Sequence, residues 1–180
     1  MDRPIELVPL LCIQCSVPIQ AGIDEIAWAC ENCGRGQMLD EIEGLTSLEI
    51  FFSADIPPNS LGKPYWITKA TVSLQREAYG ILGKQNGVAN RFWSHPRQFF
   101  IPAFASSLED MIATGKRLLI DPPSLHSGPP VKFEAVTLHK DDVISAVEFI
   151  IVGIEAGRKD KVKRVDFTLD FDEPVLWILE

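Results

Sequence analysis

The clearest pattern along the chain is an alternation of apolar and polar residues over Tyr65–Leu74. Aromatic and β-branched residues dominate this stretch, and such residues pack well on a pleated surface that is buried on one side. The segment therefore predicts the principal strand of a sheet. The residues expected on its buried face are Trp66, Thr68, Ala70, Val72 and Leu74.

A second apolar run, Val143–Ala156, predicts a helix. Its β-branched residues would also suit a strand, but its length of about fourteen residues is that of a helix. Asp141 or Asp142 can cap its first turn, and Gly157 follows its last residue. Because the run is apolar almost all round, we expect it to be the central buried helix of its domain.

A shorter helix is predicted to begin after Ser106, which together with Glu109 forms a capping box, and to end before Gly115. The remaining pattern predicts short strands separated by loops rich in Pro, Gly and Asn. The expected strands are 48–52, 91–93 with 98–104, 118–120, 133–138, 165–171 and 175–179, and the expected loops are 56–64, 80–90 and 121–130. The fold class is thus α+β, with a mostly antiparallel sheet and two helices.

The N-terminal part has a different character. Ile26–Ala29 is a short apolar strand, and the turn at 21–24 suggests a hairpin partner near Ile19. The acidic connector Asp40–Gly44 marks a boundary, which divides the chain into domains at residues 1–42 and 43–180. A domain as small as the first buries too little apolar surface to fold alone, so it needs another source of stability.

Candidate chemistry is concentrated in this small domain, which contains all four cysteines as two Cys-x-x-Cys pairs. Cys12 and Cys15 form the first pair, and Cys30 and Cys33 form the second, fourteen residues further on. The short spacing within a pair lets both thiolates reach one ion, and two pairs can surround Zn²⁺ tetrahedrally. Four thiolates leave no coordination position open, so the motif predicts a structural zinc and not a catalytic one.

Residues 5–40 resemble the zinc-ribbon, or rubredoxin-like, family of metal knuckles. The resemblance rests on the four cysteines and on Gly34, which lies where a positive φ is often needed; Ser16 has the equivalent place after the first pair. It implies a fold and a metal but no single function. The rest of the chain looks like uncharacterised bacterial proteins that attach a ribbon to an α+β domain. An iron centre of the rubredoxin type fits less well, because both of its turns normally carry Gly and its pairs lie farther apart.

Charge changes the expectation about partners. The net charge is −8, and residues 1–50 contain nine acidic residues against two basic ones. Nucleic-acid affinity depends largely on cations that contact phosphates, so an acidic ribbon argues against a nucleic-acid partner. One basic cluster offers an alternative phosphate contact, although a solvated turn between a helix and a strand is the more ordinary explanation. Its members are Arg158, Lys159, Lys161, Lys163 and Arg164.

The location of the protein follows from what its sequence lacks. The chain begins with no basic segment followed by an apolar run, so we expect no signal peptide. The longest apolar run, near Val143–Ile154, is shorter than the roughly 20 residues that a membrane span needs. A cytoplasmic protein without membrane contact is predicted, and in that compartment paired cysteines serve as metal ligands before they serve as disulfides.

No motif announces a reaction. His95 and His126 lie in separate polar loops, no nucleophile elbow or phosphate-binding loop is present, and no residue is assigned as catalytic. The aromatic residues of 65–104 suit a packed core, or an interface if they are exposed. We therefore predict a zinc-binding adaptor with a protein partner. The alternatives are a nucleic-acid-associated accessory protein that uses residues 158–164 and an enzyme with an unrecognised site near His95 or His126; the oligomeric state stays open.

Overall fold

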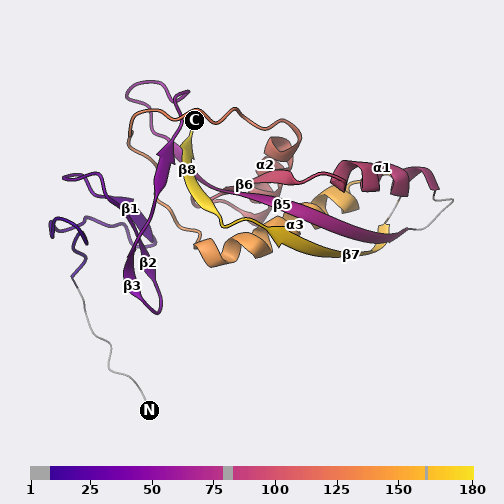
Figure 1. Cartoon of the computed structure of the whole chain (residues 1–180), viewed down its shortest axis with the longest axis horizontal. Coiled ribbons are helices and arrows are strands. Elements are labelled where there is room, and N and C mark those ends of the chain that lie inside the picture. Colours follow the sequence, from indigo (N-terminus) through magenta and orange to yellow (C-terminus); the bar gives the residue numbers. More distant parts are fainter. Residues whose placement is uncertain (1–8, 79–82, 161) are drawn as a thin grey trace, which may run out of the picture.

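The computed structural model describes residues 9–78, 83–160 and 162–180, which form a mixed α+β fold with two sheets and three α-helices (Figure 1). The predicted α+β class is confirmed, with one helix more than expected. The elements are β1 (Ala27–Ala29), β2 (Gly36–Asp40), β3 (Gly44–Ser47), β4 (Ile50–Phe52), β5 (Lys63–Ala78), α1 (Gly83–Trp93), β6 (Arg97–Pro102), α2 (Leu108–Ile120), the 3-10 helix η1 (Lys140–Asp142), α3 (Val143–Ala156), β7 (Val162–Phe171) and β8 (Val175–Leu179).

The larger sheet is built around β5, which contains the predicted strand and extends beyond both of its ends. On one side β5 pairs antiparallel with β6, and on the other it pairs antiparallel first with β8 and then with β7. β4 lies beyond β8 and runs parallel to it. The expectation of a mostly antiparallel sheet is therefore confirmed, with β4–β8 as its parallel pair.

The core lies between this sheet and the helices α2 and α3. The predicted inner face of β5 is confirmed, because residues 66, 68, 70 and 72 are all buried. Trp66 is fully buried and donates a hydrogen bond from Nε1 to the carbonyl oxygen of Leu138 at 2.8 Å. Over residues 64–68 the opposite face is buried as well, where Tyr65 and Ile67 pack with Phe100. From residue 69 onward burial alternates, so that the outer face of the sheet is polar and exposed.

The first wrong prediction concerns residues 83–93, which form α1 instead of a loop followed by a strand. Residues 80–82 of the predicted loop lie outside the described residues. Ala89, Phe92 and Trp93 have the i, i+3, i+4 spacing of a helix face, and Ala89 and Trp93 are buried. Burial of that face outweighs the low helix propensity of the Gly and Asn residues in the segment.

Further predictions fail near α2 and after it. The helix is capped by Ser107, not Ser106, and continues through Gly115 to Ile120, so residues 118–120 are not a strand. Gly115 is needed for packing, because a Cβ atom there would collide with Ile150 of α3. Residues 133–138 form only single bridges, at positions 133 and 136, in place of the predicted strand.

The predicted helix 143–156 is confirmed as α3, but it is buried on one side only. Ile144, Phe149 and Val152 are 37%, 48% and 45% exposed. The helix covers the inner face of a two-layer fold, so its outward face has no protein above it among the described residues. The expectation of a helix buried all round is therefore wrong.

A buried ionic network joins α3, α1 and β5 at the end of the molecule far from the cysteines. Glu155 is fully buried and accepts hydrogen bonds from Trp93 Nε1 at 2.8 Å and Arg158 Nε at 2.7 Å. Arg76 Nε lies 3.1 Å from the same carboxylate, and its other nitrogens bind both carboxylate oxygens of Asp160 at 2.6 and 2.8 Å. The hydrogen bond from Arg76 lowers the pKa of Asp160 below its usual value.

The Pro-rich loop after α2, residues 121–130, is hydrogen-bonded to the end of β4. Ala54 donates to the carbonyl oxygen of His126 at 2.8 Å, and Gly128 donates to that of Phe52 at 2.7 Å. The backbones approach so closely that a Cβ atom on Gly128 would lie 2.6–2.8 Å from backbone atoms of Ser53 and Ala54. Only glycine fits this contact without displacing the loop.

Gly128→Ala is therefore expected to lower the free energy of unfolding by about 1–3 kcal/mol, the usual cost of forcing a methyl group into packed space. The matched control is Gly87→Ala in α1, where an added Cβ meets nothing within 4 Å. That change should leave stability unchanged or raise it by up to about 1 kcal/mol, because Ala favours helix. Urea unfolding followed by circular dichroism measures both, and equal midpoints for the two variants would contradict the packing argument.

Candidate metal centre

The second cysteine pair lies on the turn between β1 and β2. β1 leads directly into Cys30, and β2 returns at Gly36 in antiparallel register. The predicted strand at Ile26–Ala29 is confirmed, but its partner is β2 and not the chain near Ile19. The first pair lies on a separate loop that is closed by a bridge between Leu11 and Pro18.

The two cysteine turns have the same backbone design. In the first, Cys12 donates to the carbonyl oxygen of Val17 and Ser16 donates to that of Cys12, both at 2.9 Å. The second turn repeats these bonds around Cys30, at 2.9 and 2.8 Å. Each needs a left-handed residue after its second cysteine, and Ser16 (φ 58°) and Gly34 (φ 74°) supply it. The conformation predicted for both positions is confirmed.

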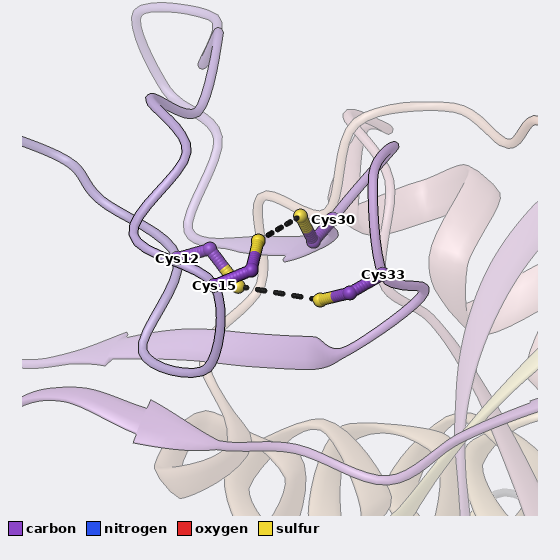
Figure 2. Close-up of side chains that lie close together, drawn as sticks. All are labelled: Cys12, Cys15, Cys30 and Cys33. Carbon is purple, nitrogen blue, oxygen red and sulfur yellow. Dashed lines mark hydrogen bonds between the residues drawn. The ribbon is translucent and has the colours of Figure 1, made fainter.

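The four sulfur atoms come together as one cluster (Figure 2). Cys12 Sγ lies 3.6 Å from Cys33 Sγ, Cys15 Sγ lies 3.6 Å from Cys30 Sγ, and all four lie within 4.8 Å of one another. A tetrahedral ion with metal–sulfur bonds of about 2.3 Å separates its ligands by about 3.8 Å. None of the four is in a disulfide. The predicted set of ligand residues is therefore one cluster that can bind a metal ion.

The backbone of the turns favours anionic sulfur. The amide of Val17, and after it the side chain of Asn32, hydrogen-bond to Cys15 and lower its pKa to about 6. Amides of the first turn, that of Cys15 foremost, also lower the pKa of Cys12. A backbone amide acts to lower the pKa of Cys33 too, but burial and the neighbouring thiolates outweigh it and raise the pKa to about 12. Four thiolates this close repel one another unless a cation lies between them.

A buried glutamine fixes the first turn to the sheet. Gln37 of β2 is fully buried, and its Oε1 accepts a hydrogen bond from the amide of Ile13, between the first two cysteines, at 3.1 Å. Gln37 and Asn32 were not among the predicted site residues. The one signal in the sequence was a polar side chain within a short apolar strand, and nothing local showed what it contacts.

A groove of about 1030 Å³ lies beside the metal centre. The groove is lined by residues that follow the first cysteine pair, by the second cysteine turn with Trp28, and by Phe52, Leu61 and residues 130–133 at and after the end of the Pro-rich loop. The residues that line it are Val17, Pro18, Ile19, Gln20, Glu25, Trp28, Ala29, Cys30, Glu31, Asn32, Gly34, Phe52, Leu61, Pro130, Val131, Lys132 and Phe133. Apolar and polar groups both line the groove, and its charged residues are Glu25, Glu31 and Lys132.

The other candidate residues of the sequence lie elsewhere. His95 and His126 are both exposed, and neither lines the groove. Three members of the basic cluster pair with carboxylates, Lys159 has no ion pair among the described residues, and Lys161 lies outside them. The described pairs are Arg158 with Glu155 at 2.7 Å, Lys163 with Glu77 at 3.8 Å and Arg164 with Asp166 at 2.7 Å. Most aromatic residues of 65–104 are buried, as a packed core requires.

No protein-family model, curated protein or solved structure matches this chain. In the part of the chain that the structure describes, no helix is long and apolar enough to cross a membrane. What the cysteine cluster and the groove can do therefore has to follow from their own geometry and chemistry.

Proposed function

We propose that this protein is a zinc-binding adaptor, in which a four-thiolate zinc holds a small ribbon in the shape that binds a segment of a protein partner. The sulfur spacing fits a tetrahedral ion, and the two turns have the backbone bonds of metal knuckles. Four protein ligands fill the coordination shell, so the metal in this proposal is structural.

The observation that carries the adaptor role is that the second metal-binding turn is itself part of the groove wall. Cys30, Glu31, Asn32 and Gly34 all line it. A metal that fixes this turn also fixes the groove, and binding by the groove then depends on the metal. A zinc placed only for stability would have no need of an adjoining groove.

The lining indicates what kind of segment the groove accepts. Protein interfaces combine apolar side chains that lose contact with water and polar groups that stay hydrated, and the groove is lined by both kinds. Glu25 and Glu31 line the groove from the ribbon, and Lys132 lines it from the chain that follows the Pro-rich loop. The volume is at the upper limit for small-molecule pockets, and an open groove of this size suits an extended peptide. A peptide with apolar side chains next to a basic residue is the expected ligand.

The test uses the zinc-loaded full chain, panned against a random-peptide library, with affinities measured by fluorescence anisotropy. Leu61, which is 56% exposed, forms part of the groove wall away from the metal. Leu61→Glu should weaken selected peptides at least about tenfold, since a buried charge costs more than 1.4 kcal/mol. Chelation should abolish binding.

The matched control is Ile42→Glu, which adds the same charge at a residue that is 95% exposed and outside the groove. It should bind as the wild type does. The adaptor role is wrong if no peptide is enriched, or if Leu61→Glu binds peptides with unchanged affinity.

The alternative functions have less support. A nucleic-acid role needs free cations, but Arg158, Lys163 and Arg164 face carboxylates. An enzyme that used His95 or His126 needs a site that encloses them, and both are exposed outside the groove. Neither alternative has an observation of its own in its favour.

A further inference from the structure

The outer edge of β7 has no partner strand among the described residues. β7 spans ten residues and pairs with β5 along its other side. In Figure 1 it follows the border of the larger sheet. Proteins normally protect such an edge with a proline, a bulge, or charged side chains on the edge or pointing inward. β7 carries charged residues on its exposed face but no proline. Here the inward positions Val165, Phe167 and Leu169 are apolar, and the pairing with β5 is irregular only at its far end, after Glu77.

The backbone of β7 shows which residues could bind a second strand. Asp172 donates to the carbonyl oxygen of Lys69 at 2.8 Å, so its N–H group points toward β5. Backbone groups of an antiparallel strand point alternately to its two sides. The backbone groups of residues 170, 168 and 166, at every second position before Asp172, therefore also point toward β5. Those of Val165, Phe167 and Leu169 point to the free edge.

We propose that β7 is a self-association site, at which two copies of the chain pair antiparallel about a twofold axis through Phe167. In this register Phe167 lies opposite its own counterpart, and Val165 lies opposite Leu169 of the second copy. These are the residues whose backbone groups point outward, so each opposed pair can exchange two hydrogen bonds. The two sheets then continue into one, with the helices of both copies on the same face.

Charge complementarity on the exposed face supports the same register. Arg164, which pairs with Asp166 of its own strand at 2.7 Å and is otherwise exposed, lies opposite Asp170 of the second copy, and the symmetry makes this pair twice. Directly opposed unlike charges stabilise an antiparallel pair. An axis at Leu169 would instead oppose Asp166 to Asp172, and an axis at Val165 would shorten the overlap. The register that satisfies the backbone is thus also the one that matches the charges over the longest overlap.

Exposed apolar residues lie along the same edge. Ile144 and Phe171 are 37% and 38% exposed, and they adjoin Leu169 where α3 begins. In the proposed register Lys163 of the second copy stands opposite Phe171, and the aliphatic stem of a lysine can cover an aromatic ring. The joined strands thereby remove apolar surface from water in addition to forming backbone hydrogen bonds.

This self-association does not rest on the adaptor role. β1 and β2, with the metal centre, lie at the opposite end of the long axis from the start of β7 (Figure 1). Loss of peptide binding and loss of dimerisation can therefore be measured separately, on the same preparation.

The test is sedimentation of the full metal-loaded chain over a range of concentrations, with charge variants on the exposed face. The wild type should show a monomer–dimer equilibrium. Arg164→Asp should weaken the dimer at least about tenfold, because it opposes two aspartates at both symmetric positions. Asp170→Arg should do the same by opposing two arginines. The double variant R164D/D170R should recover most of the affinity that each single variant loses, because it exchanges the two charges across the interface, although it removes the Arg164–Asp166 pair within each copy.

The control is Lys69→Asp, which makes the same charge change on the same face of the sheet but on β5. It should dimerise normally, and circular dichroism should show every variant folded. A wild-type chain that stays monomeric up to about 1 mM, a Kd at which association is worth only about 4 kcal/mol, would overturn the proposal. Failure of the double variant to recover dimerisation affinity would also overturn it. If β7 pairs with a strand of a different protein instead, the wild-type chain will stay monomeric in this experiment.

Discussion

Removal of the metal is expected to unfold the cysteine region and to lower or split the thermal transition of the protein. Zinc contributes about 10–16 kcal/mol to the folding of small isolated zinc-finger peptides. In this chain the cysteine region is also stabilised by packing, because Ala27 and Met38 belong to the same hydrophobic cluster as Trp66. We therefore expect the larger sheet and α3 to remain folded after chelation. Calorimetry with and without chelator, together with hydrogen exchange, measures both the shift and its location.

The corresponding variant is Cys30→Ser, which removes a buried ligand. It should lose bound zinc and show the melting behaviour of the chelated wild type. The matched control is Gln14→Ser, an exposed non-ligand position between the cysteines of the first pair. It should keep one zinc per chain by elemental analysis. Iron with a reversible redox couple in the native protein would make this an electron-transfer centre, and a metal-free native protein would remove the basis of the adaptor role.

Glu155→Ala is expected to lower the free energy of unfolding by about 3–5 kcal/mol. The change leaves the indole N–H of Trp93 without its acceptor, and it removes a negative charge that faces Arg76 and Arg158. Removing one partner of a buried ionic group is costly because the opposite charge stays buried. Denaturant unfolding, monitored by circular dichroism with the slope checked for two-state behaviour, measures the loss.

Two comparisons make this result specific to the network. Glu148→Ala lies on the exposed side of the same helix and should change stability by no more than about 0.5 kcal/mol. Glu155→Gln keeps an acceptor for Trp93 but loses the charge, so it should fall between the alanine variant and the wild type. Equal effects for Glu148→Ala and Glu155→Ala would show that the buried carboxylate contributes nothing of its own.

The cluster of four cysteines was predictable because its sequence signal is local. Two residues between cysteines are enough to identify a pair, and the left-handed positions Ser16 and Gly34 follow at a fixed offset. The groove was not predictable, since its walls come from segments far apart in the chain. The division at residue 42 stays a prediction: it falls in the turn between β2 and β3, so β3 lies beyond it and still pairs with β2.

The predictions that were wrong concern segments in which a tertiary contact outweighed the local sequence preference. Gly83–Trp93 contains residues typical of loops, yet Ala89 and Trp93 find a buried site against β5 only as a helix face. Gly115 suggests the end of a helix, but it lies inside α2 because Ile150 of α3 occupies the space beside it. Such contacts join residues that no sequence window spans.

The sequence by itself determined the four cysteines that cluster, the conformation of their turns, the α+β class, the inner face of β5 and the span of α3. Each depends on periodicity or spacing within a few residues, so backbone geometry and side-chain chemistry are enough to define it. Only the tertiary structure decided that Gln37 fixes the first cysteine turn, that the second turn forms a groove wall, and that Glu155 is buried among cations. It also decided that β7 has a free edge among the described residues. These features depend on which distant segments come together, and the packing of the whole chain sets that choice.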